Sequence, residues 1–295
     1  VIRLCQLPQA SLGLWPAGVD KDGLLFCNQY FADYPKNIPD GKFDPLTVEP
    51  EWMLLSYHKT ACASSSRSGF DPQNAFDESI KSAWSATSGN NEEWLSVDLG
   101  KEYNVEAVQV NFADCFTKKK RAPMKEYGGT FTQERYIEEE LVRYEYRIEY
   151  SSNGTDWAPY EETQNTVFPH KLIPRRARAR YIRIVFAGAP YGQNFSISGL
   201  RVFGLDGGEK PSAVSGENAE RTSATEARLS WNSQNDAMGY CIRLGIAPDK
   251  LYNSILLYGQ NDYTVTFLNK ETEKYYFAVD SFNESGITKG SINEF

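Results

Sequence analysis

The sequence predicts an all-β protein built from two β-sandwiches and an N-terminal β-hairpin. Apolar and polar residues alternate in short runs, for example over residues 144–150 and 240–246, and turn residues separate these runs. Tyr (18), Phe (16) and Trp (6) are plentiful, as is typical of pleated strands. The dipeptide Asn153-Gly154 lies between two such runs and predicts a hairpin with a type I′ turn. Only the charged stretch at residues 134–142 favours a helix.

The overall composition argues against several classes of protein. The 295 residues carry a formal net charge of −8, whereas a nucleic-acid partner requires a basic surface. No apolar run approaches the roughly 20 residues that cross a membrane. We therefore expect no nucleic-acid partner and no membrane span. The cysteines are odd in number and widely spaced, so they predict neither a zinc knuckle nor a disulfide framework; they are Cys5, Cys27, Cys62, Cys115 and Cys241.

Changes in composition divide the chain into three parts. A polar linker rich in Gly and Pro, Leu205–Pro211, ends the middle part, and a weaker boundary lies near Tyr57–Ala61. We therefore predict domains at residues 1–57, 58–206 and 207–295. The alternating runs recur in the last two, and each of these is expected to be a sandwich.

The first 57 residues contain a predicted hairpin formed by residues 14–19 and 24–30. They are too few, and too often interrupted by proline, to form a core alone. We expect them to be the end of a larger upstream domain or a strap packed on the first sandwich. The chain opens without Met, directly in strand-like residues, so we expect a fragment whose export signal lay upstream. The expected location is secreted, periplasmic or at the cell surface.

The middle part carries six motifs in a fixed order. They are Ala63–Ser66, Asn74–Asp77 with Ser82–Ser85, Glu93–Gly100, Tyr146–Gly154, Ala179–Ile184 and Ile197–Gly204. On these motifs, residues 61–204 resemble the F5/8 type C (discoidin) family, which includes the family 32 carbohydrate-binding modules. The resemblance implies a discoidin-like jelly-roll β-sandwich. Trp84 is expected in its core, because large aromatic side chains usually anchor sandwiches.

The resemblance also implies a ligand site on the loops at one end of the sandwich. Sugars there stack on an aromatic ring, while planar donors or amides hold their hydroxyl groups. The loop before the last strand supplies Tyr191, Asn194 and Phe195, and an earlier loop supplies Arg67 and Phe70. We expect these five residues to bind carbohydrate. The alternative is that Phe195 and Phe70 only plug the end of the sandwich.

A structural calcium ion is a further implication of the resemblance. The family often holds this ion in the turn at Asp77, with a hydroxyl-bearing residue at the position of Ser82. Hard oxygen ligands on a tight loop suit calcium. The family also places an acidic ligand in its last strand, where this chain has Gly199. The sequence therefore leaves calcium open.

A long insertion at residues 114–141 replaces what is a short loop in the family. It contains a basic run at 118–121 and an acidic run at 138–140. These runs are either solvated charges or a docking surface for an upstream domain or an acidic glycan. The arginine-rich segment 175–180 could join such a surface, although alternating arginines usually form the exposed face of a strand.

The C-terminal part resembles a fibronectin type III module over residues 211–292. The resemblance is carried by Leu229-Ser230-Trp231 and by Tyr275–Gly286, in which Tyr275 is expected to form a tyrosine corner. The segment Leu12–Asn28 is similar to the closing strands of a family 43-type glycoside hydrolase propeller. The whole order of domains is similar to the tails of xylosidase- or arabinofuranosidase-type proteins of Bacteroidetes.

These expectations combine into a functional hypothesis without catalysis. Glycoside hydrolysis needs two carboxylates held across a sugar, but the N-terminal aspartates, such as Asp20 and Asp22, stand beside Gly and Pro as turn residues do. We expect a non-catalytic accessory region of a secreted glycoside hydrolase that binds plant or host glycan. Its partners would be this glycan and an upstream catalytic domain. The alternative is a structural scaffold that braces a catalytic propeller without binding sugar.

Overall fold

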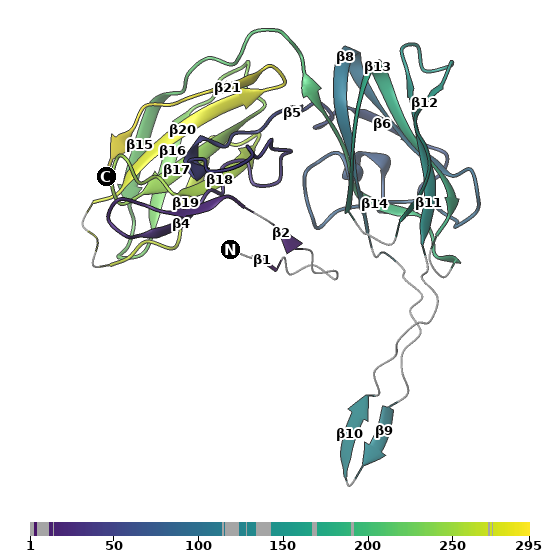
Figure 1. Ribbon diagram of the computed structural model, residues 1–295, viewed down its shortest axis with the longest axis horizontal. Coiled ribbons are helices and arrows are strands. Elements are labelled where there is room, and N and C mark those ends of the chain that lie inside the picture. The colour runs from purple at the N-terminus through teal and green to yellow at the C-terminus, as the bar shows by residue number, and fades with distance from the viewer. Residues whose placement is uncertain are drawn as a thin grey trace. The chain divides into compact units, whose positions relative to one another are not determined.

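The computed structural model describes residues 3–4, 12–13, 15–113, 115, 124–127, 129–133, 143–166, 170–189, 192–270, 272 and 274–295. Within these residues, regular structure consists of β-strands and two short 3-10 helices, η1 (Pro45–Thr47) and η2 (Pro72–Ala75) (Figure 1). The predicted all-β fold class is thereby confirmed. None of the described helices is long or apolar enough to span a bilayer. The helix expected at residues 134–142 lies outside the described residues.

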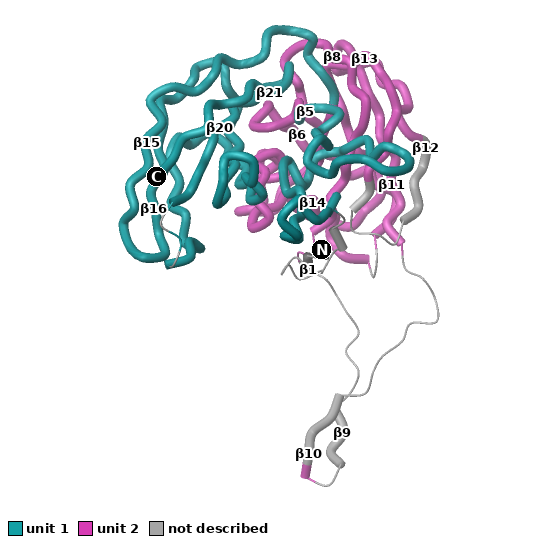
Figure 2. Tube along the Cα trace, turned by 60° about the vertical axis from the view of Figure 1, so that its left-hand side comes forward, with its two compact units in different colours: residues 1–6, 10–54, 204–295 teal, residues 7–9, 55–203 magenta. Residues whose placement is uncertain are grey.

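The chain divides into two compact units (Figure 2). Unit 2 contains residues 55–203, while unit 1 joins residues 10–54 to residues 204–295. The boundaries expected at residues 58 and 206 fall close to these divisions. The N-terminal segment, however, belongs to the same unit as the C-terminal sandwich.

Unit 2 is an antiparallel sandwich in which two long strands carry most of the pairing. The sheet order is β12-β11-β13-β8-β14, while β6 pairs with β8 and β7 pairs with β14. The register between β8 and β13 jumps where Gly100 takes a positive φ of 91°, so β8 bulges there. The strands are β6 (Thr60–Ala63), β7 (Trp84–Ser85), β8 (Trp94–Phe112), β11 (Tyr144–Ser151), β12 (Ala158–Thr166), β13 (His170–Gly188) and β14 (Ser196–Leu205).

The core of unit 2 follows from the alternation of side chains along these strands. Leu95, Val97 and Leu99 point inward from β8 and are almost completely buried. Trp84 is fully buried as well, and its indole nitrogen donates to the carbonyl of Ser65 at 3.0 Å. The expectation that Trp84 is a core residue is therefore confirmed.

The hairpin predicted at Asn153-Gly154 exists, but its turn differs from the predicted type I′. Strands β11 and β12 are joined by a six-residue loop, residues 152–157. Gly154 alone of the two has a positive φ. The Asn153 side chain instead accepts hydrogen bonds from the amides of Thr155 and Asp156, both at 2.9 Å. These bonds stabilise a wider loop, because an Asn side chain can replace a backbone carbonyl in a turn.

The insertion at residues 114–141 contains one described hairpin. Strands β9 (Met124–Tyr127) and β10 (Thr130–Gln133) pair antiparallel with each other. The sequence did not predict this hairpin. The basic run at 118–121 and the acidic run at 138–140 lie outside the described residues, so both interpretations of these charges stay predictions.

The C-terminal part of unit 1 is a second antiparallel sandwich. One sheet has the order β15-β16-β19 and the other has the order β18-β17-β20-β21, with β22 also paired to β20. Trp231 and Tyr275 are buried in the core, and the Tyr275 hydroxyl accepts the Asn269 amide at 2.7 Å. This bond is the one expected of a tyrosine corner. The strands are β15 (Ser215–Arg221), β16 (Ala227–Asn232), β17 (Gly239–Gly245), β18 (Asn253–Tyr258), β19 (Asp262–Val265), β20 (Tyr276–Asn283), β21 (Gly286–Thr288) and β22 (Asn293–Glu294).

Residues 15–54, which we call the strap, pack on this C-terminal sandwich and complete unit 1. The Phe26 ring stacks on Tyr252 with centroids 4.6 Å apart, and Phe31 meets Phe282 edge to face at 5.1 Å. The predicted hairpin is present as β3 (Ala17–Val19) and β4 (Leu25–Cys27). The aromatic side chains of the strap thus pair with those of the last sandwich, while the expected domain assignment of residues 1–57 stays a prediction. The remaining strands are β1 (Arg3–Leu4), β2 (Leu12–Gly13) and β5 (Met53–Leu54).

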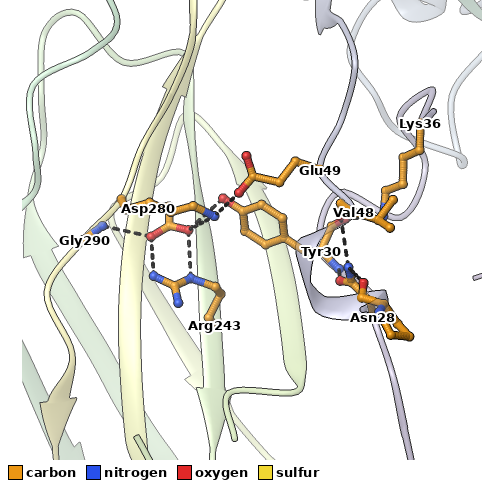
Figure 3. Close-up of polar contacts among 10 residues, drawn as sticks. Asn28, Tyr30, Lys36, Val48, Glu49, Arg243, Asp280 and Gly290 are labelled. Atoms are coloured by element: carbon orange, nitrogen blue, oxygen red, sulfur yellow. Dashed lines mark hydrogen bonds and ion pairs between the residues drawn. The ribbon is translucent and has the colours of Figure 1, made fainter. Parts of the chain in front are cut away.

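A buried carboxylate fixes the strap to the sandwich (Figure 3). Asp280 on β20 has no exposed surface and accepts from Arg243 through two bonds of 2.8 Å. The Tyr30 hydroxyl of the strap donates to the same carboxylate at 2.7 Å, and the Gly290 amide donates at 2.9 Å. Burial and the neighbouring Asp280 charge raise the pKa of Tyr30, so the phenol keeps its proton and acts as the donor.

Candidate functional site

Three loops of unit 2 are joined by backbone hydrogen bonds. We call residues 64–70, 85–93 and 193–195 the end-loop cluster. The Arg67 amide donates to the Ser85 carbonyl at 2.8 Å, and the Ala86 amide donates to the Phe195 carbonyl at 2.9 Å. The predicted ligand loops are thus held side by side, although they come from distant parts of the sequence.

Glu93 connects two of these loops through their serine hydroxyls. Its carboxylate accepts from Ser64, from Ser65 at 2.8 Å and from Ser88 at 2.7 Å. Burial raises the pKa of Glu93, but the hydroxyl donors outweigh that effect and hold the pKa below its usual value. Glu93 was not among the residues predicted from the sequence. The available signal was a carboxylate at the start of a strand, preceded by two loops rich in serine.

Phe195 does not reach the surface of the end-loop cluster. Its ring is fully buried and stacks on Phe186 with centroids 4.2 Å apart. The prediction that this ring stacks on a sugar is therefore corrected: the loop turns inward one residue before β14 begins, and the ring fills the core. The alternative that Phe195 plugs the sandwich is the one that the structure supports. Asn194 is half-buried, and its amide donates to the Ala86 carbonyl at 2.9 Å.

Arg67 and Phe70 occupy the two ends of one tight turn. The Phe70 amide donates to the Arg67 carbonyl at 2.9 Å, and Gly69 supplies the positive φ of 81° within the turn. Arg67 is exposed and Phe70 is half-buried. The turn therefore carries a planar donor and an aromatic ring three residues apart. Tyr191, the remaining predicted contact, lies outside the described residues.

The turn that begins at Asp77 is closed by its own side chains. One carboxylate oxygen accepts the Ser79 amide at 2.9 Å, and the other accepts the Ser82 hydroxyl at 2.6 Å. The structure thus brings together the two residues proposed as calcium ligands. Both Asp77 oxygens already accept a hydrogen bond within the protein.

The surroundings of this turn fit a calcium ion poorly. Calcium normally takes six to eight oxygen ligands, which are carboxylates, carbonyls and waters. The neighbouring carboxylate, Glu78, accepts from the buried Arg201 guanidinium at 3.0 Å and pairs with it at 2.9 Å. A side chain at Gly199 would meet the Asn111 amide nitrogen at 2.9 Å. The last strand therefore brings a positive charge to this region, and its backbone at Gly199 lies against Asn111.

The N-terminal aspartates have the turn role that the sequence predicted. One Asp20 oxygen accepts the amides of Asp22 and Leu24, both at 2.9 Å, and the other pairs with Lys250 at 2.9 Å. The Lys250 ammonium is the main reason that the pKa of Asp20 lies far below its usual value. Among the described residues, no group of three His, Cys, Asp or Glu side chains is placed to hold a metal ion.

The arginine-rich segment of β13 faces carboxylates of β8 across the sheet. The three pairs have distances of 2.7 to 3.0 Å and join Arg176 to Glu106, Arg178 to Glu102 and Arg180 to Asp98. This arrangement confirms the interpretation of these arginines as an exposed strand face. Their charges are locally compensated, so the segment does not form a basic patch of its own.

Solved structures similar to this chain include several carbohydrate-binding modules. Chitosan-binding module 1 from a chitosanase/glucanase of Paenibacillus sp. IK-5 is 23% identical, with a TM-score of 0.40, and covers 52% of this chain and 99% of its own. A CBM32 produced by Clostridium perfringens, in complex with GlcNAc-α-1,4-galactose, is 14% identical (TM-score 0.37, coverage 53% and 96%). A pectin-binding module is 20% identical (TM-score 0.38, coverage 50% and 91%).

The family comparison matches the first part of unit 2. No curated protein sequence matches the chain. The matched segment begins at the first residue of β6, includes the Arg67–Phe70 turn and the Asp77–Ser82 turn, and ends with β10. Residues 60–133 match the F5/8 type C domain family.

Proposed function

We propose that this chain is a non-catalytic, carbohydrate-binding accessory region of a secreted glycoside hydrolase. In this proposal it binds plant or host glycan through the end-loop cluster of unit 2. The observation that carries the proposal is the Arg67–Phe70 turn, which presents a guanidinium and an aromatic ring within an F5/8 type C domain. Asn194 lies in the same cluster and supplies a further amide group.

The chemistry of the turn suits a sugar ring. A sugar has an apolar face of C–H groups that packs on an aromatic ring, and hydroxyl groups that planar donors and amides bind. The Ser85 backbone fixes both ends of the turn, since it also donates to the Phe70 carbonyl at 3.2 Å. A turn that is already ordered loses little conformational entropy when a ligand binds.

The proposal extends to the other parts of the chain. The sheet orders β15-β16-β19 and β18-β17-β20-β21, together with the Tyr275 corner, support a fibronectin type III-like domain at residues 207–295. The resemblance of residues 12–28 to propeller strands supports a family 43-type parent enzyme of Bacteroidetes. An export route to the periplasm, cell surface or medium is part of the same proposal.

A structural scaffold is the second candidate function, and one observation favours it. The end-loop cluster satisfies many of its polar groups internally, and Phe195 is buried in the core. A domain that only braces a neighbour needs such rigidity and no free ligand contacts. In that case, removing residues 58–295 from the parent enzyme would lower its stability without changing its substrate range.

Titration of the whole chain with sugars tests the proposal. Calorimetry or chemical-shift titration would use galactosides, xylo-oligosaccharides and arabino-oligosaccharides at up to millimolar concentration. We expect binding that Arg67→Ala and Phe70→Ala each weaken. Arg178→Ala is the matched control, because this exposed arginine pairs with Glu102 outside the end-loop cluster. Absence of binding by the folded chain, or equal weakening by the control, would reject the proposed site.

A further inference from the structure

Unit 1 contains a pocket where the strap lies beside strands β18 and β19. Its described lining comes from residues 15–33 of the strap and residues 253–267 of the sandwich, and we call it the strap pocket. Its volume of about 630 Å³ falls within the range of 300–1,000 Å³ that is typical of small-molecule sites. The end-loop cluster belongs to unit 2, so the two are separate sites.

Two contacts between the strap and the sandwich involve residues close in sequence to those that line the strap pocket. The Tyr34 and Tyr258 hydroxyls share a hydrogen bond of 2.7 Å between the strap and β18. The Phe26 ring stacks on Tyr252, immediately before β18. Both contacts lie within the protein and fix the strap against the segment around β18.

Three aromatic side chains line the strap pocket. Trp15 comes from the strap, Tyr263 comes from β19 and Phe267 follows that strand. The Phe267 side chain is 51% exposed, which leaves ring surface available to a ligand. The apolar C–H face of a sugar ring packs well on such surfaces. The Trp15 indole nitrogen itself is buried, so this residue contributes ring surface to the pocket.

The polar side chains of the strap pocket select against negative charge. Gln29, Asp33 and Asn253 are exposed and line it with amide and carboxylate groups, which bind hydroxyls. Among its described lining residues there is no Lys, Arg or His to neutralise an anion. A phosphate or uronate would therefore find no basic side chain among these lining residues.

We infer that the strap pocket is a second carbohydrate site, which takes the neutral mono- or disaccharide end of a glycan. Aromatic surface, hydroxyl-binding groups and the absence of basic side chains among its described residues together point to this ligand class. The inference does not depend on binding at the end-loop cluster. It assigns a recognition role to the strap, which the proposed function leaves as a structural element.

Cys27 lines the strap pocket and reports on its occupancy. The full chain carrying Arg67→Ala would be treated with iodoacetamide, and the alkylation rates of Cys27 and Cys62 followed by peptide mass spectrometry. Xylobiose, lactose and digalacturonate serve as probes. We expect one of the neutral disaccharides at millimolar concentration to slow the alkylation of Cys27 several-fold, while the exposed Cys62 reacts unchanged. Digalacturonate should give no protection.

Phe267→Ala tests whether the protection arises in the pocket itself. This half-exposed ring can be removed with little effect on the core. We expect the variant to raise the sugar concentration needed for protection about five- to tenfold. Ile246→Ala is the control, because Ile246 is 50% exposed in the same unit and does not line the pocket. The inference is overturned if no neutral sugar protects Cys27, if digalacturonate protects equally, or if Phe267→Ala has no more effect than Ile246→Ala.

Discussion

Removing the Tyr30 hydroxyl is expected to loosen the strap by a measurable amount. The hydroxyl is buried with Asp280 and donates to its carboxylate at 2.7 Å. A hydrogen bond to a charged group contributes about 1.5–3 kcal/mol. In Tyr30→Phe the Asp280 carboxylate keeps its bonds from Arg243 and Gly290. The loss of stability should therefore lie near the lower end of this range, at about 1.5–2 kcal/mol.

The substitution isolates the hydroxyl because the ring remains in place. Lys289 lies over the Tyr30 ring at 3.8 Å from its centroid, and phenylalanine preserves that contact. Native-state hydrogen exchange of the strap measures the effect without requiring both units to unfold together. The Asn28 amide, bonded to the Pro16 carbonyl at 2.8 Å, is a suitable reporter. We expect its protection to fall roughly tenfold or more, since about 1.4 kcal/mol corresponds to one factor of ten.

Tyr34→Phe provides the matched control for this prediction. The Tyr34 hydroxyl also links the strap to the sandwich, but its partner is the neutral Tyr258 hydroxyl at 2.7 Å. A neutral bond contributes about 0.5–1.5 kcal/mol. The raised pKa keeps the Tyr30 hydroxyl protonated at neutral pH, so the loss of protection in Tyr30→Phe should not vary across this pH range. Equal or greater loss of protection in Tyr34→Phe would show that the buried carboxylate does not make Tyr30 the stronger anchor.

Three further predictions concern unit 2. Glu93→Gln should destabilise the chain by about 1–3 kcal/mol at neutral pH in urea unfolding. Since the folded-state pKa of Glu93 lies below its ordinary 4.5, the carboxylate contributes stability above that value, and the difference should shrink as acidification protonates it. Phe195→Ala should cost about 3–5 kcal/mol in the same assay, as expected for a core ring; a small loss with abolished sugar binding would indicate a surface role. Calcium in place of EDTA should leave the melting temperature unchanged, because Arg201 already supplies positive charge beside the Asp77 turn. A rise that saturates with calcium and disappears in Asp77→Ala would show that the turn binds the ion.

The fold class could be predicted from the sequence because it depends on local patterns. Apolar and polar residues alternate along β8 and β11, and this places Leu95, Val97 and Ile148 in the core. Because side chains along a strand point to alternate faces, the pattern determines which face of the strand is buried. The Gly/Pro linker similarly indicated a break in the chain near the end of β14. The turn at Asn153 shows where such patterns become less specific. Its side chain can cap several loop lengths, and the sequence alone does not select one of them.

The candidate site could be predicted only in part, because exposure depends on distant residues. The loop that contains Phe195 is polar on both sides, which suggests an exposed ring. The ring stacks on Phe186, which lies on β13. Glu93 was missed for a related reason, since its role depends on hydroxyls from two separate loops. Patterns in one segment do not show which other segment will cover it.

The position of the strap depends on contacts between residues that are far apart in sequence. Local patterns do not show such contacts, and the strap pocket was therefore not predicted. Tyr30 and Asp280 are 250 residues apart in sequence, yet their bond and the Phe31–Phe282 contact fix where the N-terminal segment lies. No sequence motif next to Tyr30 or Asp280 indicates that the two residues interact. A buried aspartate in a strand is costly unless several donors meet it, so Asp280 required a long-range partner that the sequence did not identify. With Tyr30 in that position the strap lies beside β18, and Trp15 lines one pocket together with Tyr263 and Phe267.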